Sequence, residues 1–104
     1  MPSPPPTPPV PISAVHVGGN QILITFDSPL VQSNPMPFNF TGRLSDFLFI
    51  GSSAVIGVDG ALTIGVTTST SQVGADFVTW IDTFSDLIGV NGLYVASFSE
   101  FLTT

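Results

Sequence analysis

The hydrophobic and polar residues of this chain alternate in short runs that turn-forming residues separate. Branched and aromatic residues dominate the runs, as expected for strands. Gly18-Gly19-Asn20, Asp27-Ser28-Pro29 and Asn91-Gly92 punctuate the pattern with turns. We predict strands at residues 12–17, 21–26, 47–50, 54–58, 61–66 and 93–98, and residues 38–41 are a further candidate as an edge strand.

The clearest turn is Asp59-Gly60, which lies between the strand candidates Ala54–Val58 and Ala61–Val66. Asp-Gly accepts the positive φ angles of a type I′ turn, so this dipeptide predicts a two-residue hairpin. The register of that hairpin pairs Val55 with Ile64, Gly57 with Leu62 and Ile56 with Thr63.

Two other segments are predicted to be loops. Pro35 and Pro37 keep residues 31–42 out of the middle of a sheet, because proline cannot donate to the hydrogen-bond ladder. Residues 67–75 are rich in Thr, Ser and Gly, which favours a loop there too.

Residues 76–89 fit two structures. Their six large apolar side chains fall on one helical face, with Asp76 as the N-cap and Gly89 just after the helix. Most of the other residues are middling-to-poor helix formers. The alternative is a strand over Phe77–Ile81 and a loop over Asp82–Asn91, and we favour this second structure.

About seven short strands with regular turns predict an all-β fold, an antiparallel β-sandwich of two sheets. Alternate residues of each strand would meet in the core between the sheets. We expect Phe26, Ile64 and Trp80 to lie in that core, with Trp80 near its centre.

The N-terminal region differs from the rest of the chain. Seven of the ten prolines lie in residues 2–11, which predicts an extended polyproline II arm of roughly 30 Å. We divide the chain into this arm, residues 1–11, and a β-sandwich domain, residues 12–104. The arm is either a spacer or disordered tail, or a segment that lies on a neighbouring subunit. The prolines that would make this contact are Pro4, Pro5, Pro6, Pro8 and Pro9.

The charge of the chain limits its partners. Charged residues make up only 8% of the sequence, Lys is absent, and the net charge is −6. Nucleic acids and anionic membrane surfaces are bound through clusters of Lys and Arg, so we expect neither as a partner. No segment has the pattern of a membrane span. A charge-poor surface favours lasting protein contacts, and the alternative is an uncharged polar surface on a secreted or surface protein.

Residue types needed for common chemistries are missing or isolated. The chain has no Cys, which excludes disulfides, thiol catalysis and Cys-ligated zinc. His16 is the single His, and no Gly-x-Ser-x-Gly motif accompanies it. Asp82 and Asp86 could bind calcium but lack the spacing of an EF-hand. We expect no enzyme activity and no cofactor. We expect Arg43 to form a surface ion pair with one of the chain's carboxylates, for example Asp46, and the alternative is a contact with a carboxylate of a partner protein.

Two stretches of the chain resemble bacterial Ig-like modules. Ile12–Leu30 resembles their first two strands, with a Gly/Asn turn and a hydrophobic-Thr-Phe strand. Asp86–Phe98 is similar to their closing loop and last strand, and the two stretches cover about a third of the chain. The resemblance implies an Ig-like antiparallel β-sandwich. Such modules occur in surface adhesins and on tailed-phage virions, and a small free-standing copy resembles a virion accessory protein.

The resemblance, the arm and the low charge together favour a non-enzymatic structural protein of a virus particle. We expect a capsid decoration or cement protein, located on the virion, that binds capsid or other virion subunits and forms a homo-oligomer. The alternative is a cell-surface or extracellular Ig-like module that binds carbohydrate. Such a module would stack sugar rings on exposed aromatic side chains such as Trp80 or Tyr94.

Overall fold

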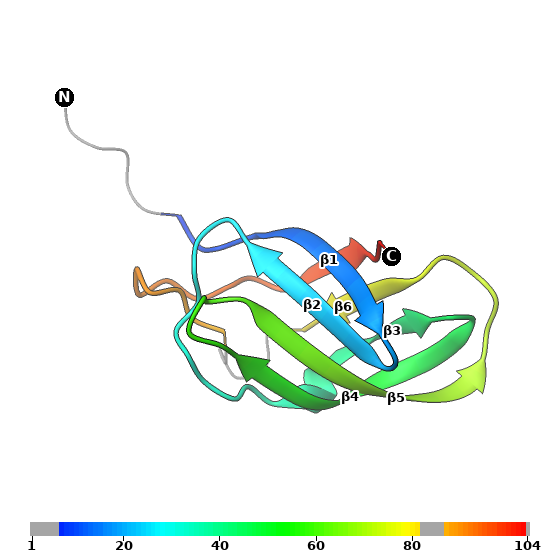
Figure 1. Ribbon diagram of the computed structural model, residues 1–104. Coiled ribbons are helices and arrows are strands. Elements are labelled where there is room, and N and C mark those ends of the chain that lie inside the picture. The colour runs from blue at the N-terminus through cyan, green and yellow to red at the C-terminus, as the bar shows by residue number, and fades with distance from the viewer. Residues whose placement is uncertain (1–6, 82–86, 104) are drawn as a thin grey trace.

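The computed structural model describes residues 7–81 and 87–103, and this part of the chain forms seven antiparallel strands (Figure 1). The strands build a single sheet in the order β1-β2-β5-β4-β3-β6-β7. The all-β class and the antiparallel strands are therefore confirmed, and one continuous, curled sheet stands in place of two separate ones. The strands are β1 (Pro11–Gly18), β2 (Gln21–Phe26), β3 (Phe40–Leu44), β4 (Phe47–Ile56), β5 (Leu62–Ser71), β6 (Phe77–Trp80) and β7 (Phe98–Phe101), and a 3-10 helix, η1 (Pro37–Asn39), precedes β3.

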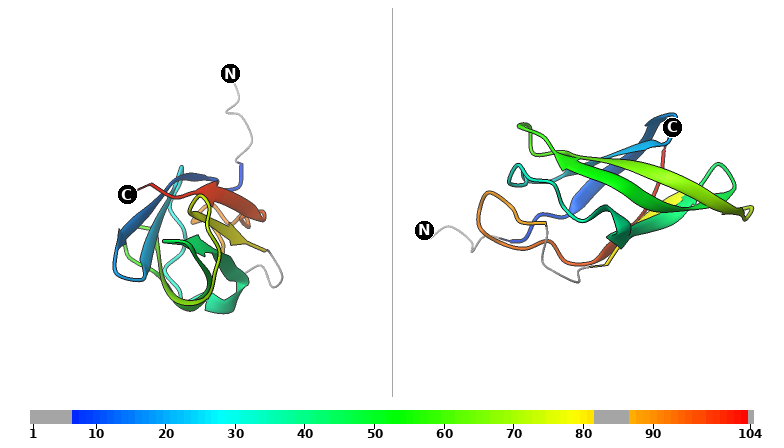
Figure 2. Two further views of the ribbon diagram at one scale, coloured as in Figure 1. Left: turned by 90° about the vertical axis from the view of Figure 1, so that its right-hand side faces the viewer. Right: turned by 90° about the horizontal axis from the view of Figure 1, so that it is seen from below.

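The edge strands β1 and β7 come together and nearly close the sheet into a barrel (Figure 2). Thr103, just after β7, pairs in parallel with Val15 in the middle of β1. The N–H of His16 donates to the carbonyl of Thr103 at 2.7 Å, and the N–H of Thr103 donates to the carbonyl of Ala14 at 2.9 Å. These bonds satisfy edge groups that would otherwise be open to another chain.

The interior of the barrel is filled by one cluster of apolar side chains, because alternate residues of each strand point inward. Trp80 is fully buried, and its ring packs between those of Phe40 and Phe98 at centroid distances of 6.2 and 5.8 Å. Phe98 also meets the ring of Phe26 edge-on at 5.9 Å. Phe26 and Ile64 are buried in the same cluster.

The β4–β5 hairpin forms, but its predicted register is wrong by one residue. The ladder ends at the pair Ile56–Leu62 and contains the pair Ala54–Ile64. All four of these side chains are buried. A slip of one residue would turn one strand of the pair outward, so burial of this face fixes the observed register.

The reason for the shift is a loop longer than two residues. The N–H of Gly57 donates to the carbonyl of Ala61 at 3.1 Å, and the N–H of Gly60 donates back to the carbonyl of Gly57 at 3.0 Å. Gly60 has a φ of +80°, which fits the last position of a three-residue hairpin loop. Asp59 caps the turn by accepting the N–H of Ala61 at 3.1 Å.

The strand predicted at the edge of the sheet lies inside it. β3 pairs with β4 on one side and with β6 on the other. Pro35 and Pro37 do not interrupt this ladder, because the 3-10 helix that starts at Pro37 ends before the strand begins at Phe40. The prolines therefore restrict only the approach to the strand.

Two further boundaries differ from those predicted. β5 continues to Ser71, so half of the loop predicted at residues 67–75 is strand, and its threonines suit a strand because they are β-branched. The last strand begins at Phe98, later than the predicted residues 93–98. Within that earlier stretch Tyr94 forms one isolated bridge, with Ile88.

The ambiguous segment begins as a strand, since Phe77–Trp80 form β6 between β3 and β7. The strand alternative is confirmed for these residues, while residues 82–86 of the predicted loop lie outside the described residues. In the described ranges, no helix is long and apolar enough to cross a bilayer.

The barrel has two ends, which we call the arm end and the far end. At the arm end the chain enters β1 and meets the loops at residues 27–31, 57–61 and 87–94, where the N–H of Leu30 donates to Gly60 at 3.2 Å. At the far end lie the β1–β2 turn, the β3–β4 turn and the loop at residues 72–76. Figures 1 and 2 show the described start of the chain and the end of β7 on opposite sides of the molecule.

Candidate interaction surfaces

The candidate catalytic and metal-binding side chains do not come together as a site. His16 lies in β1 with its Nε2 atom 2.7 Å from the carbonyl oxygen of Gly19, so the ring closes the β1–β2 turn. Within residues 7–81 and 87–103, no group of three or more His, Cys, Asp or Glu residues is placed to hold a metal ion. Asp82 and Asp86, the pair considered for calcium, lie outside the described residues.

Arg43 holds the far-end loop rather than pairing with Asp46. Its Nη1 donates to the carbonyl of Ala75 at 3.0 Å, and its Nη2 donates to Oε1 of Gln72 at 2.7 Å. The guanidinium carbon lies 5.3 Å from the ring centroid of Phe77, which is a cation–π contact. The carboxylate of Asp46 instead accepts a backbone N–H of the same loop at 3.4 Å. The predicted ion pair with Asp46 is therefore wrong.

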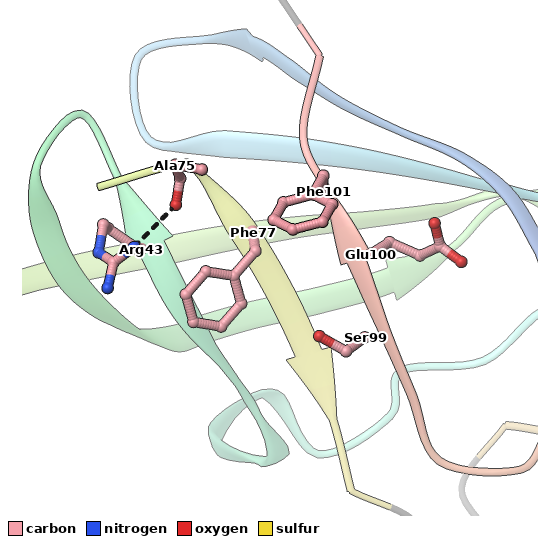
Figure 3. Close-up of a pocket in the computed structure, with 6 residues that line it drawn as sticks. All are labelled: Arg43, Ala75, Phe77, Ser99, Glu100 and Phe101. Atoms are coloured by element: carbon pink, nitrogen blue, oxygen red, sulfur yellow. Dashed lines mark hydrogen bonds between the residues drawn. The ribbon is translucent and has the colours of Figure 1, made fainter.

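A hollow of about 320 Å³ lies on the outer surface where β3, β6 and β7 run side by side (Figure 3). The register places Arg43 beside Phe77 and Phe77 beside Phe101, so these side chains form one row across the three strands. Phe101 is 75% exposed. We call this site the aromatic hollow, and its lining residues are Arg43, Ala75, Phe77, Ser99, Glu100 and Phe101.

The polar groups around the aromatic hollow are mostly satisfied within the chain. Both terminal nitrogens of Arg43 donate to the far-end loop. Thr79 and Ser99 share one hydrogen bond between their hydroxyl oxygens, which lie 3.0 Å apart. Two hydroxyls that share one bond use only one O–H for it, so within residues 7–81 and 87–103 the other O–H remains available to donate. In Figure 3 the carboxylate of Glu100 points away from Phe77, so the surface between the rings is largely uncharged.

The described part of the arm, residues 7–10, is fixed to the arm end by three hydrogen bonds. The N–H of Val10 donates to Oδ1 of Asp27 at 3.0 Å, and the N–H of Asp27 donates back to the carbonyl of Val10 at 2.9 Å. Nδ2 of Asn91 donates to the carbonyl of Thr7 at 3.0 Å. The arm therefore leaves the barrel from a defined root.

The predicted contact prolines are divided between two environments. Pro9 is buried at the root, and a Cβ on Gly89 would come within 2.6 Å of its ring. Pro8 is exposed. Pro4, Pro5 and Pro6 lie outside the described residues. Beside the root, a second hollow of about 280 Å³ runs along residues 7–11 and 96–98.

The aromatic side chains considered for sugar stacking do not form a platform. Trp80 is fully buried in the core, so its faces are closed to a ligand. Tyr94 is 52% exposed in the loop before β7, away from the aromatic hollow. The prediction that Trp80 stacks on sugar rings is therefore wrong.

Some of the exposed apolar side chains lie at the two ends of the barrel, while others, such as Ile50 and Val55, lie on the outer side of β4. At the arm end, Val58 is 91% exposed at the tip of the β4–β5 loop and Val90 also lies exposed. At the far end, Val73 is 81% exposed in the loop at residues 72–76. Val17 and Phe47 are also exposed, and each lies within two residues of a far-end turn. Single exposed apolar side chains are common on protein surfaces, and they mark an interaction site only where they join into a continuous patch.

Sequence reasoning missed the aromatic hollow. The sequence predicts a strand at Phe77, but Phe101 lies beyond the last predicted strand. The signal that could have found it is the spacing of Phe98 and Phe101, since an odd separation in a strand puts two side chains on opposite faces. One of these two rings must therefore lie outside the core.

Comparison with models of protein families and with curated proteins gave no match. Among solved structures, the chain matches part of surface layer protein SbsC, domains 1–6, with a TM-score of 0.66 and 17% sequence identity. The match covers 92% of this chain and 13% of that chain, so the present chain spans a small part of its length. At this identity the likeness shows a shared fold.

Proposed function

We propose that this chain is a non-enzymatic structural module of a cell-surface assembly, joined to its neighbours by protein–protein contacts. The observation that carries the proposal is the fold match to a surface layer protein over 92% of the chain. The scarcity of charge supports it, because charges are depleted where proteins stay in contact. Burial of the exposed apolar side chains at the two ends of the barrel would stabilise such contacts.

This proposal replaces the expected virion location. The comparisons match no viral protein, and they support the cell-surface alternative better than capsid decoration. The proposed mechanism is the same at a cell surface and on a virion. A small barrel with few charges presents surfaces that neighbouring subunits bury, and each Å² of buried apolar area stabilises the assembly by about 25 cal/mol. Carbohydrate binding is not part of the proposal, because Trp80 is closed to solvent.

The test is to locate the protein on the cells that express it. An antibody raised against the purified chain should label intact cells about as strongly as permeabilised ones, and protease added outside the cells should remove the label. A cytoplasmic protein labelled in parallel controls for broken cells. Labelling that requires permeabilisation, or recovery of the protein only with purified virus particles, would show that the proposed location is wrong.

A further inference from the structure

We propose that residues 2–6 of one copy of this chain bind in the aromatic hollow of a second copy, so that copies join arm end to far end. The inference rests on the proposed structural role and names a partner for it. It is supported by the chemistry of the hollow, the chemistry of the segment, the direction of the arm and the exposed side chains at the two ends.

The hollow has the surface that proline-rich segments bind. Phe77 and Phe101 come from neighbouring strands and present their rings to the same space (Figure 3). Extended proline-rich segments dock in grooves lined by aromatic side chains. They lose little conformational entropy when they do so, because proline already restricts the backbone to the bound shape.

The hydrogen-bonding groups of segment and hollow are complementary. Residues 2–6 read Pro-Ser-Pro-Pro-Pro, so the segment offers backbone carbonyls and almost no N–H groups. The hydroxyl pair of Thr79 and Ser99 beside the hollow has one O–H left to donate. The segment is uncharged, and it needs no charged partner because the terminal nitrogens of Arg43 are already bonded within the chain.

The arm would have to reverse its direction to enter the hollow of its own copy. The root fixes residues 7–10 at the arm end, beside Asp27 and Asn91. These residues lead into β1, and β7 runs beside β1 in the same direction, because Thr103 pairs in parallel with Val15. The segment would therefore have to fold back at Thr7 to lie along its own β7, which is unfavourable for a stiff, extended proline-rich segment. The hollow therefore receives the segment of another copy.

Contact between opposite ends would also cover the exposed valines. Val58 and Val90 lie in loops at the arm end, and Val73 and Val17 lie near the far-end turns. A second copy whose segment occupies the hollow brings its arm end toward this far end. Side chains that are costly to expose would then be removed from water on both copies.

A contact between two different surfaces repeats in one direction. Each copy carries one segment and one hollow, so binding leaves a free segment at one end of a pair and a free hollow at the other. Repetition of such a contact produces either a closed ring or an open filament of copies. A five-residue segment buries little area, so we expect an association that depends strongly on concentration.

The experiment measures the mass of four purified forms by sedimentation over a range of concentration. The forms are the full chain, a chain lacking residues 1–6, Phe101→Ser, and Val55→Ser as the control. Val55 is exposed on the outer side of β4, away from the hollow. We expect the full chain and the control to assemble beyond dimers, and the deletion and Phe101→Ser forms to associate at least about tenfold more weakly.

Mixing the two defective forms distinguishes this contact from others. The shortened chain keeps an intact hollow and Phe101→Ser keeps an intact segment, so an equimolar mixture should form dimers and stop there. A full chain that stays monomeric at about 1 mM would overturn the proposal. So would a dimer that survives removal of residues 1–6, because two hollows would then face each other. Cell-surface labelling is independent of these masses, so the failure of one proposal leaves the other standing.

Discussion

Two rows of side chains cross the same three strands of this barrel on opposite faces. The inner row joins Phe40 of β3, Trp80 of β6 and Phe98 of β7. The outer row joins Arg43, Phe77 and Phe101 of the same strands. Each outer residue is three positions from its inner counterpart, and an odd separation in a strand reverses the face.

The rows have similar chemistry and different surroundings. In the inner row, Phe40 and Trp80 are fully buried and stacked with a centroid distance of 6.2 Å. In the outer row, Phe101 is largely exposed, and Phe77 is covered on one side by Arg43. We infer that the first row stabilises the fold and that the second is available to a partner.

The largest effect is expected from the inner row. Trp80→Ala removes the ring between Phe40 and Phe98 and should lower the free energy of unfolding by about 3–5 kcal/mol. That is a large share of the roughly 5–15 kcal/mol typical of a domain. Denaturant unfolding followed by circular dichroism measures it, because the substitution removes the single Trp as a fluorescent probe. Trp80→Phe is the matched control and should lose less, and an Ala variant within 1 kcal/mol of the natural chain would contradict the inner role.

The next largest effect is expected where β3 and β6, two of the strands that carry both rows, lie closest together. A Cβ on Gly42 of β3 would collide with the backbone carbonyl of Phe77 and come within 2.9 Å of the ring of Phe49. Gly42→Ala should therefore cost about 1–3 kcal/mol of stability in the same unfolding experiment. Gly57→Ala is the control, because its Cβ would meet only the side chain of Asp59, at 3.2 Å. Equal losses of stability for the two variants would mean that the close approach of β3 and β6 at Gly42 does not contribute to stability.

The burial of the inner row could be predicted from the sequence, because it depends on the alternation of apolar and polar residues along each strand. Runs such as Gln21–Phe26 mark the strand and its buried face without knowledge of the partner strands. Trp80 follows the same rule once its segment is taken as a strand. The hairpin register failed because Asp59-Gly60 fits both a two-residue and a three-residue loop, and the choice between them depends on which side chains are buried.

The outer row could not be predicted in this way. Arg43, Phe77 and Phe101 meet only because β3 lies beside β6 and β6 beside β7. That order connects strands that are distant in the sequence, and no local pattern determines it. For the same reason Arg43 was assigned to a near neighbour in sequence, Asp46, while its actual partners lie in the loop that precedes β6.

A smaller effect is expected from the polar member of the outer row. Arg43→Met keeps an apolar stem beside Phe77 but removes the bonds to Ala75 and Gln72. These bonds are partly exposed, so the loss of stability should be about 1–2 kcal/mol, and amide exchange at residues 72–75 should speed up. Gln72→Ala removes one of the two bonds and should have the smaller effect on both measurements. Unchanged exchange in the loop would show that Arg43 does not hold it.

The smallest effect on stability is expected where the largest effect on association is proposed. Phe101→Ser removes a side chain that is 75% exposed, so the free energy of unfolding should change by no more than about 0.5–1 kcal/mol, much of it from the pairing with Phe77. Val55→Ser should have a similar effect on unfolding and none on association. If Phe101→Ser instead lowered stability as much as Trp80→Ala, the outer ring would belong to the core, and its effect on association would be explained by unfolding. A stable variant that no longer assembles shows that the same three strands carry a row for folding and a row for contact.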